Sequence, residues 1–252
     1  MELIKKIKNK KELIGLPDFL VKEKLENYLG KNKIKLPLKE KDEKIVIKEV
    51  RSKLREYVGR FRVKFSSKKR MEFLEKEKIS ELLRTHSSTK ERLDSESYLI
   101  LKKIIAKMKP KSILDLACGL NPIALAQKNI KYYASDINME DLNIVKLYFK
   151  KKKITGKVYV SDLTKEKNFP KTDLCLILKT LDILEKGNYK FAENLIKNIP
   201  CKDMIISFST RTLSGKPMNR PERTWFERIL EKINYKYDKT KTFNEIFYII
   251  KK

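Results

Sequence analysis

The chain has 252 residues, with 60 Lys+Arg against 33 Asp+Glu, and its formal net charge at pH 7 is +27. Hydrophobic residues make up 41% of the chain, which is enough for a folded core and excludes a disordered tail protein. No apolar run reaches the ~18 residues of a membrane span, and the N-terminus lacks the apolar stretch of a signal peptide. The three cysteines and the single histidine are spaced too widely for a zinc site or a disulfide framework, so we expect no metal. These features predict a cytoplasmic protein.

The large positive charge favours a polyanionic partner. Nucleic acid is the leading choice, because Lys and Arg that neutralise phosphates release bound counterions. The alternative is a Lys-rich protein adapted to a hot or salt-rich cytoplasm. Residues 1–92 carry a net charge of +13 and the remainder +14, so the excess is not a detachable basic tail. Both halves are therefore expected to face one phosphate surface.

The first 92 residues are predicted to form a basic helical domain. Apolar residues recur at helical spacing within residues 19–29, 50–61 and 73–83. Leu36-Pro37 and Ser66-Ser67 lie in the breaks. We expect three or four short amphipathic helices there.

Residues 93–252 alternate between strand and helix patterns. The expected strands are 112–117, 131–135, 157–160, 173–178, 203–208, 236–241 and 245–250, and the expected helices are 95–108, 122–128, 139–152, 191–198 and 224–233. Asn121 is expected to cap the second of these helices. The alternation predicts an α/β fold with a parallel, doubly wound sheet, and the tight turn at Phe243-Asn244 adds an antiparallel hairpin at one edge. That combination is the class I methyltransferase architecture rather than a plain dinucleotide fold.

Acidic residues lie at the ends of three consecutive predicted strands. They are Asp115, Asp136 and Asp162, and parallel sheets bind ligands beyond these carboxyl ends. Asp136 follows Asp115 by 21 residues, a spacing suited to accepting hydrogen bonds from ribose hydroxyls. Asp162-Leu163 would lie at an adenine edge. Each Asp alone could simply cap a turn, but three in register favour a cofactor.

The turn after the first strand reads Asp115-Leu-Ala-Cys-Gly119. Gly119 lets the backbone approach a ligand closely. The second glycine of a pyrophosphate cradle is missing, which argues against NAD or FAD and favours a ligand without phosphate.

Five segments occur in an order that resembles a known family. They are HSSTKERL (86–93), SILDLACGLNPIALA (112–126), ASDIN (134–138), ILKTL (177–181) and ISFSTRTLSGKPMNRPERTWFE (206–227). Together they resemble the aminoglycoside-resistance 16S rRNA (guanine-N7) methyltransferases over roughly residues 80–230. The resemblance implies the Rossmann-like fold of class I S-adenosylmethionine (SAM)-dependent methyltransferases with an N-terminal helical domain. It also implies SAM as methyl donor and the 30S ribosomal subunit, near the decoding site, as substrate.

The same resemblance assigns Thr89 and Arg92 to the methionyl end of the cofactor, where a guanidinium binds a carboxylate bidentately. The alternative for Arg92 is a surface salt bridge with Asp94 or Glu96. The expected cofactor contacts are Thr89, Arg92, Asp115, Ala117, Gly119, Asp136, Ile137, Asp162, Leu163 and Lys179. His86 is expected to pack or cap at the domain junction rather than act as a base.

A guanine N7 lone pair needs no deprotonation, so no strong base is required for its methylation. The Asn/Asp-Pro-Pro-aromatic motif of exocyclic amine methylation is replaced by Leu-Lys-Thr-Leu-Asp at residues 178–182. Lys179 and Asp182 lie where the target base would arrive and are the predicted catalytic residues; the alternative is an exposed polar loop. The predicted RNA contacts are Lys68, Lys69, Arg70, Arg211, Lys216, Arg220 and Arg223.

We therefore predict a monomeric, cytoplasmic, SAM-dependent methyltransferase in which residues 1–92 dock on rRNA and residues 93–252 methylate a base of 16S rRNA. One alternative is a cytosine-N4 methyltransferase on the same fold, and another is a non-catalytic rRNA-binding assembly factor. The Lys- and Ile-rich composition suggests a housekeeping homologue of archaeal type.

Overall fold

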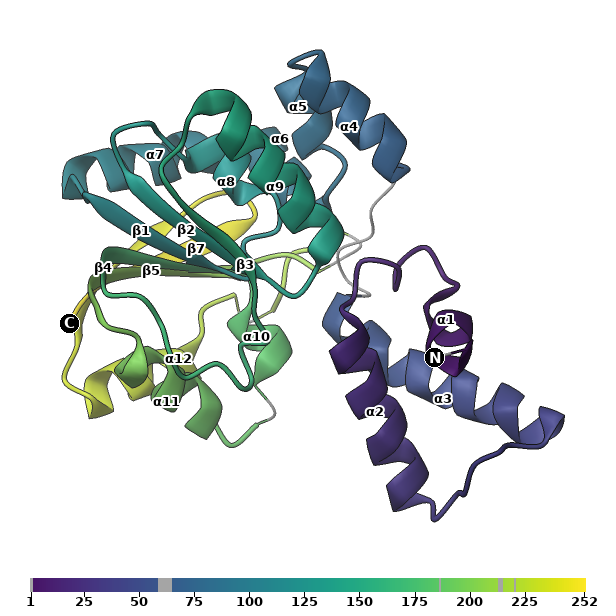
Figure 1. The fold of residues 1–252 in the computed structure, drawn as a ribbon. Helices are drawn as coiled ribbons and strands as arrows, with labels where there is room; N and C mark the ends of the chain where they lie inside the picture. The colour runs from purple at the N-terminus through teal and green to yellow at the C-terminus, as the bar shows by residue number, and fades with distance from the viewer. Residues whose placement is uncertain (1, 59–64, 186, 213–214, 220) are drawn as a thin grey trace.

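The computed structural model describes residues 2–58, 65–185, 187–212, 215–219 and 221–252. Within these residues a seven-stranded sheet is covered by helices on both faces (Figure 1). The strands are β1 Ser112–Leu116, β2 Lys131–Asp136, β3 Gly156–Val160, β4 Thr172–Leu178, β5 Cys201–Ser209, β6 Lys236–Lys241 and β7 Glu245–Lys251. Their order in the sheet is β3-β2-β1-β4-β5-β7-β6. The predicted doubly wound sheet is confirmed.

The strand order reverses between β1 and β4. β1 pairs in parallel with β2 on one side and with β4 on the other. β7 is antiparallel to both β5 and β6, so the predicted edge hairpin is also confirmed. Open sheets of this kind bind ligands at the reversal point, beyond the carboxyl ends of the strands.

Alternate residues of the central strands face opposite layers of helices. Ile113 packs toward α7 (Ser97–Met108), α8 (Asn121–Leu125) and α9 (Met139–Lys152), whereas Leu114 faces the other layer. That layer contains α10 (Leu181–Leu184), α11 (Lys190–Asn198) and α12 (Thr224–Lys232). Burial on both faces explains why β4 is a continuous apolar run.

The N-terminal helices divide between two cores. The first three helices, α1 (Glu2–Lys8), α2 (Asp18–Lys31) and α3 (Glu40–Val58), form a bundle with its own core around Leu20 and Leu54, which we call the N-terminal bundle. The next three, α4 (Ser67–Glu75), α5 (Ile79–Leu83) and α6 (Ser87–Asp94), lie against the sheet domain, and Leu74 and Leu82 join its core. The domain division at residue 92 stays a prediction, but the apolar packing changes between α3 and α4.

Two local predictions were wrong. Asn121 does not cap α8 but is its first residue, after Leu120 at the cap position, and the helix ends at Leu125. The Asn121 side chain instead accepts hydrogen bonds from Arg92 and Tyr98. The helix expected from Ser95 begins at Ser97, because Glu96 adopts a left-handed backbone conformation with φ 57°.

No helix among the described residues is long and apolar enough to cross a membrane.

Gly156 opens β3 with φ +144°, and a Cβ there would lie 1.8 Å from the Tyr132 carbonyl oxygen. We therefore expect Gly156→Ala to lower the free energy of unfolding by about 2 kcal/mol or more. Gly30→Ala is the matched control, because nothing lies within 4 Å of that Cβ. It should be neutral or stabilise the helix by up to about 1 kcal/mol. Equal denaturation midpoints for the two variants would contradict this account of β3.

Candidate active site

A pocket opens at the carboxyl ends of the central strands. Five of the predicted cofactor residues line it: Ala117, Asp136, Ile137, Asp162 and Leu163. His86 and Ser88 at the start of α6 form another part of its wall, and Tyr57 and Val58 at the end of α3 face it from the N-terminal bundle. The strand ends therefore bring two of the three predicted acidic acceptors, Asp136 and Asp162, into one pocket.

Two residues that end strands beside the pocket adopt left-handed backbone conformations. They are Ala117 after β1, with φ 51°, and Lys179 after β4, with φ 55°. Such geometry is unfavourable for residues with a side chain and concentrates at functional sites. Here it turns the chain sharply at the point where the sheet order reverses.

The Asp136 carboxylate is held by two backbone donors. Its Oδ2 accepts from the Gly119 amide at 2.8 Å, and its Oδ1 accepts from the Asn138 amide at 2.8 Å. Burial, with repulsion from Asp141, raises the pKa of Asp136 to about 6. Gly119 has φ +50°, and a Cβ there would lie 3.1 Å from the His86 ring. The site thus presents a fixed acceptor whose ionisation falls near neutral pH.

Asp162 offers a second acceptor. Its Oδ1 accepts from the Thr164 amide at 3.0 Å and from the Thr164 hydroxyl at 2.7 Å. Its Oδ2 is buried and finds no hydrogen-bond partner among the described residues. A buried carboxylate oxygen without a donor is costly, so it fits a ligand that brings one.

Asp115 and Thr89 lie behind the pocket wall. Asp115 is fully buried and accepts from the Tyr132 hydroxyl at 2.8 Å, and burial raises its pKa to about 7. Thr89 is also fully buried, with its hydroxyl against the carbonyls of Leu83 and His86. Neither lines the pocket in this structure, and their predicted contact with a cofactor remains a prediction.

His86 is buried and lines the pocket, and its imidazole does not cap α6. The ring lies 3.1 Å from the Ser88 hydroxyl and 3.9 Å from the Asp141 carboxylate. Burial lowers the pKa of His86, which favours the neutral ring.

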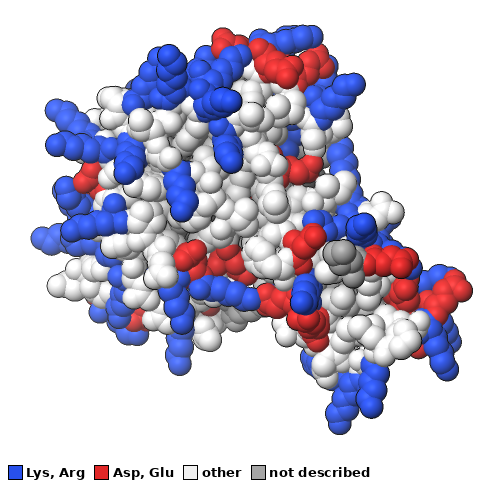
Figure 2. All heavy atoms as spheres, viewed as in Figure 1, with Lys and Arg blue, Asp and Glu red and all other residues white. Residues whose placement is uncertain are grey.

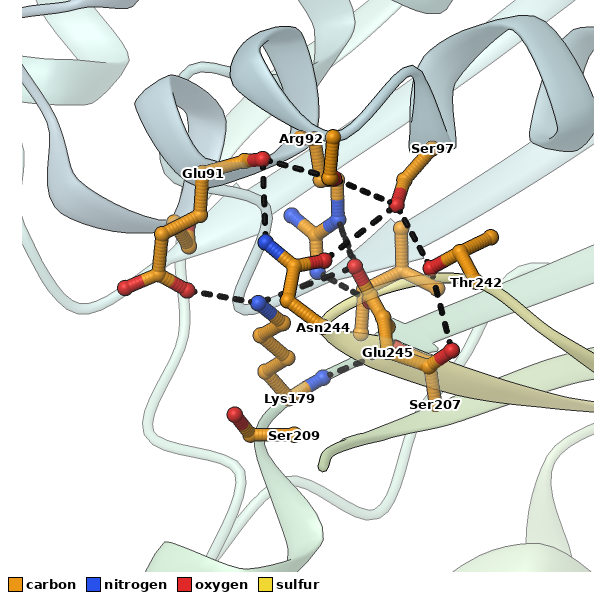
Figure 3. A network of polar contacts seen from close by, with 12 residues as sticks. Glu91, Arg92, Ser97, Lys179, Ser207, Ser209, Thr242, Asn244 and Glu245 are labelled. Atoms are coloured by element: carbon orange, nitrogen blue, oxygen red, sulfur yellow. Dashed lines mark hydrogen bonds and ion pairs between the residues drawn. The ribbon is translucent and has the colours of Figure 1, made fainter. Parts of the chain in front are cut away.

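Arg92 and Glu245 form a fully buried ion pair between α6 and β7 (Figure 3). The guanidinium binds the carboxylate through Nε at 2.9 Å and Nη2 at 2.7 Å. Its Nη1 donates to Asn121 at 2.9 Å. Arg92 therefore pairs with Glu245 and not with Asp94 or Glu96 on the surface. Asp94 pairs with Arg84 instead. Burial raises the pKa of Glu245, but attraction by Arg92 and Lys179 outweighs it and lowers the pKa overall.

Glu245 was missed by the sequence reasoning. It begins the apolar strand EIFYII directly after a tight turn, and a lone acid at that position is the signal that could have found it. Lys179 joins the same network, with its Nζ 2.6 Å from Glu91 and 3.7 Å from Glu245.

Lys179 and Asp182 flank the pocket without lining it. Lys179 is largely buried in the network of Glu245. Asp182 pairs with the guanidinium of Arg223 at 2.8 Å. The neighbouring Thr180 and Ile183 face the pocket instead. The catalytic role of both residues stays a prediction, and an ion-paired Asp182 is unlike the exposed loop that was the alternative.

The predicted RNA contacts have different surroundings. Lys68, Lys69 and Lys216 are exposed. Arg211 stacks on the Phe243 ring at 3.7 Å, and Arg220 lies outside the described residues. Figure 2 shows Lys and Arg side chains spread over both parts of the molecule rather than gathered in one tail.

Arg70 was predicted wrongly as a phosphate contact. Its side chain is fully buried, paired with Asp141 and bonded to the Thr85 hydroxyl at 3.1 Å. Arg223 is also largely buried, through its pair with Asp182. Both belong to internal ion pairs rather than to a phosphate-facing surface.

The sheet order and the acceptors at its reversal point define a class I methyltransferase fold. A family model described as "Ribosomal RNA methyltransferase (FmrO)" matches residues 74–249. The chain belongs to this family.

The chain is also similar to curated relatives and to solved structures. A 16S rRNA (guanine(1405)-N(7))-methyltransferase of Serratia marcescens is 32% identical over 177 residues, which is 69% of this chain and 70% of the relative. One from Frankia casuarinae is 28% identical over 69% of this chain and 64% of its own length. The 16S rRNA methylase RmtB has a TM-score of 0.78 at 25% identity over 100% of this chain and 97% of its own. RmtF, solved with S-adenosyl-L-homocysteine, has a TM-score of 0.82 at 22% identity with the same coverage, a likeness of fold.

We expect Arg92→Ala to lower the free energy of unfolding by about 3–5 kcal/mol, because it removes the bidentate partner of the buried Glu245 carboxylate and leaves only Lys179, 3.7 Å away, as a cationic partner. Arg84→Ala removes an exposed pair with Asp94 and should cost at most about 1 kcal/mol. Chemical denaturation of the two variants measures the difference. Similar losses for both would show that the buried pair contributes no more than a surface pair.

Proposed function

We propose that this protein transfers the methyl group of SAM to N7 of a guanine in 16S rRNA, within the 30S subunit near the decoding site. The observation that carries the proposal is the Asp136 carboxylate, fixed at the sheet reversal in a chain of the FmrO family. The choice of guanine N7 as target atom and of 16S rRNA as substrate follows the relatives, which are named 16S rRNA (guanine-N7) methyltransferases. From the proposed ribosomal substrate we infer a cytoplasmic location.

The donor groups of SAM fit the acceptors of the pocket. Asp136 would accept from the ribose hydroxyls, and the unsatisfied Oδ2 of Asp162 would accept from the adenine amine. The missing second glycine suits a ligand without pyrophosphate. When bound, SAM supplies an electrophilic methyl group on a sulfonium. Thr89 and Arg92 at its methionyl end remain an assignment from resemblance, since both lie behind the pocket wall.

The chain's own residues would orient the cofactor and exclude water. Leu178, Ile183 and Leu184 give the pocket an apolar side next to its acceptors. Methyl transfer requires in-line approach of the nucleophile, and a dry wall prevents competing attack by water. N7 of guanine attacks through a lone pair, so a neutral His86 is compatible with the reaction.

The proposed substrate agrees with the distribution of charge. The net charge is +27, and Lys68 and Lys69 on α4 are exposed beside the sheet domain. Lys216 is exposed midway along the segment between β5 and α12, and the buried Arg223 ends that segment. We propose that these lysines contact rRNA phosphates, whereas Arg70 and Arg223 support the surface from inside.

Mass-spectrometric mapping of 16S rRNA tests the proposal. Purified 30S subunits incubated with the protein and SAM should gain one N7-methylguanine near the decoding site, and Asp136→Ala should abolish it. Methylation of a cytosine would support the cytosine-N4 alternative. No methylation together with no binding of SAM would support the assembly-factor alternative.

Affinity for SAM should fall with falling pH. The pKa of Asp136 is about 6, and a protonated carboxyl no longer accepts from both ribose hydroxyls. Affinity should therefore be nearly constant above pH 7 and about tenfold weaker at pH 5 than at pH 8. Calorimetric titration measures it. Asp136→Asn should bind weakly with a flatter profile, and an unchanged profile in that variant would assign the dependence to another group.

A further inference from the structure

The N-terminal bundle is seated on the loop that follows β2. The Gly15 carbonyl, between α1 and α2, accepts from the Met139 amide at 2.8 Å. Ile137 packs against the core of the bundle. Lys165, in the segment after β3, forms an ion pair with Glu23 of α2, so a second loop of the sheet domain also contacts the bundle. The first loop in contact with the bundle begins directly after Asp136, the last residue of β2.

Gly15 allows this contact through its small size. Its backbone is outside the left-handed region, so the conformation is open to any residue. A Cβ at this position would lie 2.3 Å from Oδ1 and 2.9 Å from Cγ of Asn138. Real Cβ atoms essentially never come that close, so a side chain here requires either the Asn138 side chain or the N-terminal bundle to shift.

The Asn138 side chain cannot move away without losing hydrogen bonds. Its Oδ1 caps α9 by accepting from the amides of Glu140 at 3.0 Å and Asp141 at 3.2 Å. The backbone N–H of Asn138 donates to the Asp136 carboxylate at 2.8 Å. Losing such a cap costs about 1 kcal/mol. Displacing Asn138 therefore either uncaps α9 or disturbs the Asp136 acceptor.

The bundle also reaches the pocket directly. Tyr57 and Val58, the last residues of α3, line it opposite the strand ends. The N-terminal bundle thus contacts the loop after Asp136 through Gly15 and also forms part of the pocket wall through Tyr57 and Val58.

We propose that Gly15 is a positioning residue for the cofactor site and that the N-terminal bundle couples rRNA docking to cofactor binding. This inference rests on the proposed function. The bundle holds residues 136–139 in the geometry that accepts the ribose. Docking of the bundle on rRNA would fix its position and so strengthen cofactor binding. Thermodynamic linkage makes the effect reciprocal: cofactor binding strengthens docking by the same factor.

Calorimetric titration of SAM into full-length variants tests the positioning role. Gly15→Ala should weaken binding about fivefold or more, whereas Gly30→Ala, on an open helix surface, should bind like wild type. In an Asn138→Ala background the clash is removed, so Gly15→Ala should have little further effect. Equal affinity of Gly15→Ala and wild type, or an undiminished effect in the Asn138→Ala background, would overturn the role of Gly15.

A second titration tests the coupling. Affinity of wild type for 30S subunits should rise when S-adenosylhomocysteine is present, and Gly15→Ala should lose that rise while Gly30→Ala keeps it. An equal rise in Gly15→Ala would overturn the coupling. If wild type itself fails to bind SAM, the proposed function fails instead, so the two failures are distinguishable. Thermal unfolding of each variant identifies any loss that comes from an unfolded bundle.

Discussion

The Asp136 carboxylate connects the turn after β1 to the loop after β2, and through Asn138 that loop meets the N-terminal bundle. It accepts from Gly119 after β1 and from Asn138 after β2, and the Asn138 side chain meets Gly15 of the N-terminal bundle. These bonds satisfy a carboxylate that burial would otherwise favour in its protonated form. Asp136 also lines the pocket, so the donors of a ligand bound there would reach this carboxylate.

The buried ion pair of Arg92 and Glu245 is a second constraint on the sheet domain. Arg92 and Glu245 are 153 residues apart, yet their buried pair ties α6 to the edge hairpin and, through Asn121, to α8. Lys179 at the end of β4 joins them. A buried network of this kind is costly to break because each partner would be left charged in an apolar surrounding. It fixes α6, α8, the end of β4 and β7 relative to one another around the pocket.

The sequence predicted the sheet better than the roles of its charged residues. Strand patterns and the turn at Phe243-Asn244 can be recognised from neighbouring residues, and the sheet predicted from them is confirmed. The predicted bounds of α9, Met139–Lys152, are also confirmed. Arg70 looked like part of a solvated basic run, and its partner Asp141 is 71 residues away. Glu245 is likewise paired across the whole domain. Such long-range pairs have no period or spacing in the sequence, whereas the acidic residues at strand ends do.

A crystal structure of the full chain with S-adenosylhomocysteine tests the central claim most directly. We predict both ribose hydroxyls within hydrogen-bond distance of the Asp136 carboxylate and the adenine amine at Oδ2 of Asp162. The Gly15–Met139 contact should be intact. A ligand bound elsewhere, or one whose ribose makes no contact with Asp136, would contradict the account.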